Sequence, residues 1–120
     1  FNIALSDRDG ESTFYVRKTP MVSRIQMPQN PSDVIEAISI KTRSIDSILE
    51  QYNIPKVDWI KIDVEGAEVL VLKGARRLLS SKVNIVLESY PPNRREVIRH
   101  LLSHHFKIIP LSAYELFAHK

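Results

Sequence analysis

One stretch constrains the fold of this chain more than any other, because a strand pattern turns directly into a helix pattern between residues 57 and 79. Residues 57–62 are apolar apart from Asp58 and Lys61, which predicts a short strand buried on both faces of a parallel sheet. After Gly66 the apolar residues recur at three- and four-residue steps, as on one face of a helix: Val71, Leu72, Ala75, Leu78 and Leu79.

Acidic residues occupy the joint between this strand and this helix, namely Asp63, Glu65 and Glu68. Open α/β sheets bind their ligands at the carboxyl ends of the strands, so these side chains are candidates for chemistry. Lys61 and Asp63 share one face of the strand, and we expect them to form a buried ion pair that keeps Asp63 ionised. A purely structural role for the pair, with Glu65 and Glu68 facing the positive end of the helix, is the alternative.

The two glycines of this stretch carry separate expectations. Gly66 predicts a tight turn with a positive backbone angle, and Gly74 predicts a kink or a close packing contact inside the helix. The other elements follow from periodicity and from the positions of proline: strands at 2–5, 11–17, 38–42 and 83–89, a helix at 47–52 capped by Asp46, a helix at 94–105, and a terminal hairpin of 106–111 with 114–119. Between them, residues 18–32 predict an irregular, lid-like loop.

Composition excludes several classes of protein. The 120 residues are 43% hydrophobic and 26% charged, as in one soluble domain, and no apolar run reaches the length of a membrane span. We therefore expect a soluble, cytoplasmic protein. The net charge of +3 comes from scattered basic residues without interleaved aromatics, which argues against nucleic acid. Cysteine is absent, and His100 with His104 fits an exposed helix face better than a metal site.

The central motif resembles the FkbM-type methyltransferases. The resemblance rests on residues 60–68 (IKIDVEGAE), 71–75 (VLKGA) and 86–88 (VLE), and on the opening residues 4–7 (ALSD). It implies an α/β fold of the class I, Rossmann-like kind, with seven strands in the order 3-2-1-4-5-7-6. Residues 1–120 would hold strands three to seven, a parallel sheet ending in an antiparallel hairpin. Residues 2–5 would form strand three, residues 57–63 strand four and residues 83–88 strand five.

The same resemblance implies an activity, a cofactor and a set of site residues. The activity is transfer of a methyl group from S-adenosylmethionine to a hydroxyl oxygen of a small molecule or glycan. Leu5, Ser6 and Asp7 would lie beside the adenine. Asp63 would be the base or orienting group near the methyl group, Lys61 would tune it, and Glu65 or Glu88 would hold the acceptor.

One departure from the family concerns the cofactor. Only Gly10, Gly66 and Gly74 occur, and the first two strands of the family, with their glycine-rich loop and ribose-binding acid, have no counterpart. We expect residues 1–120 to be the C-terminal part of a longer methyltransferase domain, which self-associates in isolation through the exposed edge of strand four. Two alternatives stay open: a Mg²⁺-dependent hydrolase or nuclease that uses Asp63, Glu65 and Glu88 as ligands, and a non-catalytic α/β interaction module.

Overall fold

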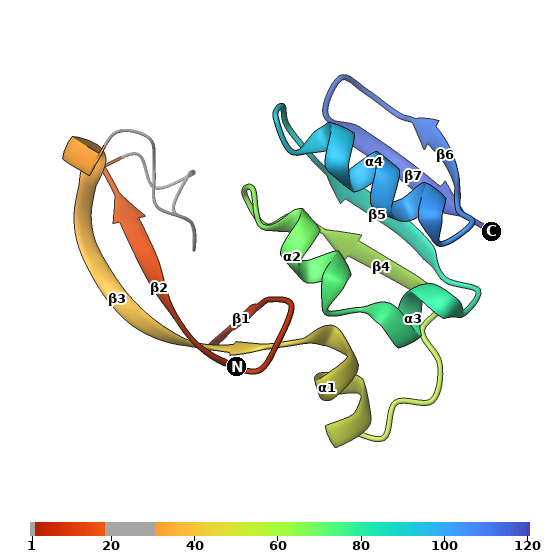
Figure 1. Ribbon diagram of the computed structural model, residues 1–120, viewed down its shortest axis with the longest axis horizontal. Coiled ribbons are helices and arrows are strands. Elements are labelled where there is room, and N and C mark those ends of the chain that lie inside the picture. The colour runs from red at the N-terminus through yellow and green to blue at the C-terminus, as the bar shows by residue number, and fades with distance from the viewer. Residues whose placement is uncertain (1, 19–30) are drawn as a thin grey trace.

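The computed structural model describes residues 2–18 and 31–120, which form two sheets and four α-helices (Figure 1). The predicted lid at residues 18–32 lies almost wholly outside the described residues. In chain order the elements are β1 (Ile3–Leu5), β2 (Gly10–Arg17), the 3-10 helix η2 (Pro31–Asp33), β3 (Val34–Arg43), α1 (Ile45–Gln51), β4 (Trp59–Ile62), α2 (Glu68–Lys73), α3 (Arg76–Ser80), β5 (Asn84–Glu88), α4 (Arg94–Ser103), β6 (Lys107–Pro110) and β7 (Glu115–His119). Each predicted strand and helix is therefore present, with shifted bounds.

The larger sheet has four strands in the order β4-β5-β7-β6. Strands β4 and β5 run parallel, with Ile62 paired to Leu87, and β7 lies antiparallel between β5 and β6. The crossover between β4 and β5 passes through α2 and α3, as a parallel pair requires. This order matches the one that the resemblance implies for strands four to seven.

The smaller sheet contradicts the expectation of one continuous sheet. Its order is β1-β3-β2, with β1 parallel and β2 antiparallel to the long central strand β3. In Figure 1, β2 and β3 form a long curved ribbon to one side of the four-stranded sheet. Within the described part of the chain no strand separates β1 from β3, so β1 satisfies its backbone groups on the free side of β3, where Ile3 pairs with Lys41.

The core lies between the four-stranded sheet and the helices. Figure 1 shows α2 and α4 on the same face of this sheet. The largest fully buried apolar side chains come from both layers: Val71, Leu72, Leu79, Val83, Ile85, Leu87, Val97, Leu101 and Leu116. The helical spacing that predicted a buried face at 71–79 is confirmed. In α4, Leu101 is fully buried, whereas the adjacent Leu102 is 54% exposed.

The second face of the four-stranded sheet is bare in the described structure. Trp59 is 61% exposed there and stacks on Phe117 at 5.7 Å between ring centroids, and Phe117 stacks on His119 at 5.2 Å. The expectation that the strand at residues 57–62 is buried on both faces is therefore wrong. It corresponds to β4, which has one exposed face and lies at the edge of the sheet. In β5 one face is fully buried and the other half-buried.

The predicted long helix after Gly66 is divided into α2 and α3 at Gly74. A Cβ atom at Gly74 would lie 2.1 Å from the carbonyl oxygen of Ser6, so the turn after β1 packs directly on the helix backbone. Close packing at this glycine was predicted and is confirmed. Asp46, predicted to cap α1, instead accepts hydrogen bonds from Arg77 N–H (2.8 Å) and Leu78 N–H (3.2 Å) at the start of α3. Ser44 caps α1.

Candidate active site

Two predicted site residues, Asp63 and Glu88, lie at the carboxyl ends of the neighbouring strands β4 and β5. Asp63 directly follows β4, and Glu88 is the last residue of the neighbouring strand β5. Lys61 Nζ lies 3.9 Å from Asp63 Oδ2, so the predicted pair exists. The prediction that it is buried is wrong, because the Lys61 and Asp63 side chains are 71% and 43% exposed on the bare face of the sheet. Asp63 is thus accessible to a substrate.

A strained turn carries Glu65 beside this carboxylate. Glu65 and Gly66 have positive φ angles of 49° and 99°, and the prediction for Gly66 is confirmed. Glu68, only 1% exposed, accepts the Gly66 N–H at 2.7 Å through Oε1. Asn93 donates to the Gly66 carbonyl oxygen at 2.7 Å and reaches Glu68 Oε2 at 3.5 Å. Glu68 and Asn93 therefore tie the turn after β4 to the start of α4, a structural role for Glu68.

Two tyrosines complete this corner of the molecule. The Tyr90 hydroxyl donates a hydrogen bond to Glu88 Oε1, and the Tyr90 ring stacks on Tyr114 with centroids 4.5 Å apart. The hydrogen bond to Glu88, together with desolvation and the charges of Glu88, Glu65 and Tyr114, raises the pKa of Tyr90 to about 12. Glu65, in the turn after β4, thus contributes to the raised pKa of Tyr90, which lies after β5. The only sequence signal for Tyr90 was its place two residues after Glu88.

The predicted adenine-binding residues lie at the carboxyl end of β1. Leu5 packs against the core, and Ser6 is 8% exposed, with its N–H on the Arg43 carbonyl oxygen at 2.9 Å. Asp7 is exposed and accepts a hydrogen bond from the Ser6 hydroxyl at 3.1 Å. A hollow of about 260 Å³ opens here, lined by residues 6–12, Thr42 and Leu70. Because Ser6 and Asp7 pack on Gly74, they lie at the opposite end of α2 from Asp63 and Glu65.

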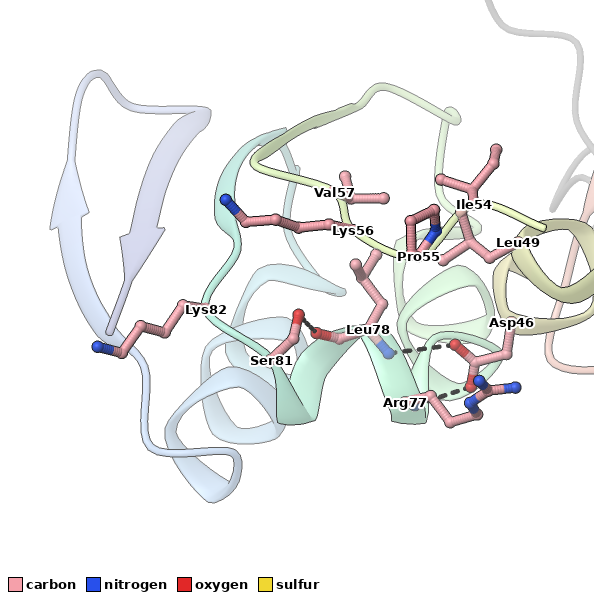
Figure 2. A pocket seen from close by; sticks show the side chains of 10 residues that line it. All are labelled: Asp46, Leu49, Ile54, Pro55, Lys56, Val57, Arg77, Leu78, Ser81 and Lys82. Carbon is pink, nitrogen blue, oxygen red and sulfur yellow. Dashed lines mark hydrogen bonds between the residues drawn. The ribbon is translucent and has the colours of Figure 1, made fainter. Parts of the chain in front are cut away.

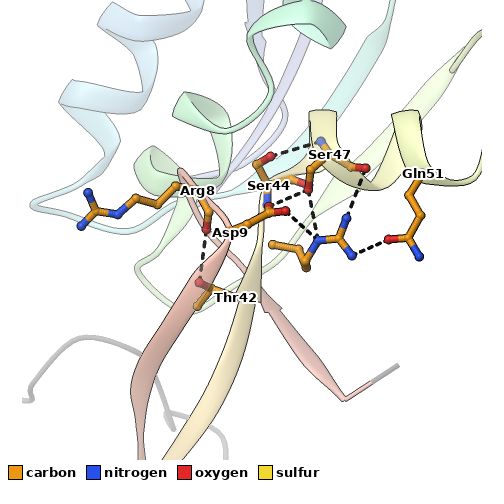
Figure 3. Close-up of polar contacts among 7 residues, drawn as sticks. Arg8, Asp9, Thr42, Ser44, Ser47 and Gln51 are labelled. Atoms are coloured by element: carbon orange, nitrogen blue, oxygen red, sulfur yellow. Dashed lines mark hydrogen bonds and ion pairs between the residues drawn. The ribbon is translucent and has the colours of Figure 1, made fainter.

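Asp9 fixes the position of this turn (Figure 3). Its carboxylate accepts hydrogen bonds from the Ser47 hydroxyl (2.6 Å) and the Ser44 N–H (2.9 Å), and it forms an ion pair with Arg43 Nε at 3.0 Å. These contacts, the Ser47 bond first, lower the pKa of Asp9. Residues 6–10 are thereby anchored to the start of α1. Sequence patterns gave no indication of this network, because Asp9 and Ser47 are far apart in the chain.

A second hollow, of about 220 Å³, lies near the amino end of β4 (Figure 2). Basic side chains line part of it: Lys56, Arg77 and Lys82. Its one carboxylate, Asp46, is already bonded to the backbone of α3, as the dashed lines in Figure 2 show. This hollow is therefore at the wrong end of the sheet for the predicted chemistry.

The metal-dependent alternative finds no support in the arrangement of ligands. Among residues 2–18 and 31–120, no three His, Asp or Glu side chains gather in a way that could hold a metal ion, and this includes the proposed set of Asp63, Glu65 and Glu88. His100 and His104 have ring centroids 5.0 Å apart. Burial, and next the charge of His104, lower the pKa of His100.

No helix in the described ranges has the length and apolar character needed to cross a membrane.

Known methyltransferases are similar to this chain in sequence. The sequence profile of the family described as "Methyltransferase FkbM domain" matches residues 1–112. A similar protein is the hexuronic acid methyltransferase AglP of Haloferax volcanii, 45% identical over 42% of this chain and 21% of that protein. Another is the 2-O-methyltransferase NoeI of Sinorhizobium fredii, 26% identical over 75% of this chain and 42% of that protein.

The chain thus spans less than half the length of these two relatives. No solved structure matches it. The profile nevertheless covers both the turn after β1 and the carboxylates after β4 and β5, and it continues into the loop between β6 and β7. The chain therefore belongs to the FkbM methyltransferase domain family.

Proposed function

We propose that this chain takes part in S-adenosylmethionine-dependent transfer of a methyl group to a hydroxyl oxygen of a small molecule or glycan. The observation that carries the proposal is the match of the FkbM methyltransferase profile to residues 1–112. The exposed Asp63 carboxylate after β4 and the half-buried Glu88 carboxylate at the end of β5 support it, because the reaction needs an acceptor for the hydroxyl proton.

In this proposal Asp63 is the base or orienting group. Its carboxylate is exposed, so an acceptor hydroxyl can reach it, and Lys61 Nζ lies 3.9 Å from Oδ2. Glu65 and Glu88 hold the acceptor by accepting hydrogen bonds from its other hydroxyls. Glu68 positions Glu65 by fixing the adjacent Gly66 N–H.

The chemistry of residues 5–7 fits one end of the cofactor. The exposed Asp7 carboxylate can accept a hydrogen bond from the amino group of an adenine. Leu70 lines the same hollow with an apolar side chain. When bound, S-adenosylmethionine supplies a methyl group activated by its sulfonium. The residues of this chain then have to align the acceptor oxygen and remove its proton, which requires little chemistry beyond positioning.

We also propose that the chain is the C-terminal part of the methyltransferase domain. Two features of the described structure support this. The outer side of the parallel strand β4 is unpaired, and the bare face of the sheet carries the stacked Trp59 and Phe117. Parallel sheets are almost always covered on both faces, so further protein segments fit both places.

The test is methyl transfer by the full-length protein that contains this chain. Incubation with S-adenosylmethionine labelled in its methyl group and a panel of methyl glycosides should give a labelled methyl ether. Mass spectrometry of the product then shows an added methyl group on oxygen. Absence of labelled product with every hydroxyl acceptor, under conditions in which the protein binds S-adenosylhomocysteine, contradicts the proposal.

A further inference from the structure

We infer that the stacked pair of Tyr90 and Tyr114, here called the platform, offers an outer ring face on which the ring of a sugar packs, while Glu88 accepts a hydrogen bond from one of its hydroxyls. This inference rests on the proposed function, and it names the substrate class of the same site. It assigns a role in acceptor binding to two tyrosines that lie outside the residues predicted from the sequence.

The platform is a defined arrangement of side chains. The two rings lie 4.5 Å apart at their centroids with 28° between their planes, and they are 42% and 47% exposed. Their backbones are joined through the Ser89 N–H, which donates to the Tyr114 carbonyl oxygen at 2.7 Å. Ser89 itself is fully buried, so the strand end that carries Tyr90 is held firmly.

The platform also lies at the proposed reaction centre. The Tyr90 hydroxyl donates a hydrogen bond to Glu88, the last residue of β5. Strand β5 pairs with β4, which leads to Asp63. The hydrogen bond orients both the Glu88 carboxylate and the Tyr90 ring. One oxygen of Glu88 is thus used by Tyr90, and the second can accept a hydrogen bond from a ligand.

A pyranose ring matches these groups better than an open-chain alcohol. Its CH faces are apolar and pack against aromatic rings, while its hydroxyls point outward to hydrogen-bond acceptors. Asp63 and Glu88, at the ends of neighbouring strands, supply carboxylates beside the tyrosine pair, and Lys61 Nζ lies 3.9 Å from Asp63 Oδ2. Carboxylate oxygens are hydrogen-bond acceptors, and they match the outward-pointing hydroxyls of such a ring.

Saturation-transfer NMR on the full-length protein tests the inference. The probes are methyl glucoside, methyl galactoside and methyl mannoside, with sorbitol as an acyclic polyol that has no ring face. We expect saturation of the ring CH protons of at least one methyl glycoside, and no displacement by sorbitol. Tyr90→Leu and Tyr114→Leu should each weaken its binding about tenfold, because one removes the outer ring face and the other removes the ring that supports it.

Three further variants separate the possible causes. Tyr90→Phe keeps the ring and should retain binding, whereas Tyr52→Leu removes a tyrosine of similar exposure (46%) on another part of the molecule and should leave binding unchanged. Glu88→Gln should weaken it. Absence of saturation transfer to every glycoside overturns the inference, as does unchanged binding in both leucine variants. The labelled-methyl assay tests the proposed function separately, so failure of this inference and failure of the proposed function can be told apart.

Discussion

At the scale of single residues, Lys61 and Asp63 show how exposure decides the energy of an ion pair. The sequence predicted a buried pair, whose disruption strands a charge at a cost of about 3 to 5 kcal/mol. In the structure both side chains are largely solvated and their charged atoms are 3.9 Å apart. Surface pairs of this kind contribute about 0 to 1 kcal/mol.

We therefore predict that Lys61→Met and Asp63→Ala each change the free energy of unfolding by less than about 1 kcal/mol. Urea denaturation of the full-length variants measures this. Ile62→Ala is the matched control, because Ile62 lies between the two residues but is 3% exposed, and its truncation should cost about 2 to 5 kcal/mol. A loss of several kcal/mol in Asp63→Ala means that the pair is buried after all.

Tyr90 carries a pH-dependent prediction. Its pKa is raised to about 12, chiefly by the hydrogen bond to Glu88, whereas an unfolded tyrosine ionises near 10. Between these values the native state keeps a proton that the unfolded state has released. Tyr90 therefore contributes its full stabilisation below about pH 10 and loses it as the pH rises through 12.

NMR of ring-labelled tyrosine measures the midpoint for Tyr90 directly. Glu88→Gln should lower this midpoint, because the neutral amide lacks the negative charge that opposes ionisation of the Tyr90 hydroxyl. Glu50→Gln, which changes an exposed carboxylate on α1, should leave it in place. A midpoint near 10 in the unmodified protein shows that the Tyr90–Glu88 bond is absent in solution.

At the scale of elements, Gly74 divides one predicted helix into α2 and α3. Alanine is the better helix former by about 1 kcal/mol, so helix propensity alone predicts that Gly74→Ala stabilises the protein. The structure predicts the opposite. A Cβ atom there meets the Ser6 carbonyl oxygen at 2.1 Å and the Ser44 Cβ at 3.1 Å, and backbone cannot rotate away as a side chain can.

Gly74→Ala should lower the free energy of unfolding by about 1 to 3 kcal/mol, the usual cost of overpacking. Chemical denaturation checks the change, with Arg76→Ala at an exposed position in α3 as the control. Greater stability in the Gly74 variant rules out close packing of the β1 turn on this helix.

The helices and strands could be predicted from periodicity because most of them bury one regular face. The 71–79 spacing predicted the apolar face of α2 and α3, and the short 112–113 connection predicted the final hairpin. The sequence predicted a kink or close packing at Gly74 but not its packing partner, and it did not predict the cap of α3 by Asp46. Both depend on residues about 30 or more positions away, Asp46 for the start of α3 and Ser6 for Gly74.

At the scale of the whole molecule, the four-stranded sheet follows the predicted order but the small sheet does not. Pairing partners across a sheet are long-range, and no local pattern shows that β1 adds to β3 rather than to a larger sheet. The candidate site was predictable to a similar extent. Asp63 and Glu88 lie at the same edge of the sheet because the ends of parallel strands meet there, whereas the tyrosine platform depends on the register of β5 and β7.

We predict that residues 1–120 alone do not bind S-adenosylhomocysteine appreciably and that they self-associate. The unpaired side of β4 and the exposed Trp59 present an edge and an apolar face to other copies. Calorimetric titration and sedimentation velocity measure the two properties. Trp59→Lys places a charge on this edge and should reduce association, and micromolar cofactor binding by a monomer contradicts the prediction.

The central claim is that Asp63, at the carboxyl end of β4, handles the acceptor proton during methyl transfer. The most direct test compares Asp63→Asn with the unmodified full-length protein in the labelled-methyl assay. Asparagine keeps the shape and removes the base, so kcat should fall about 100-fold or more with little change in the Kd for S-adenosylhomocysteine. Asp58→Asn, just before the other end of the same strand, should leave kcat unchanged. An unchanged kcat in Asp63→Asn contradicts the account.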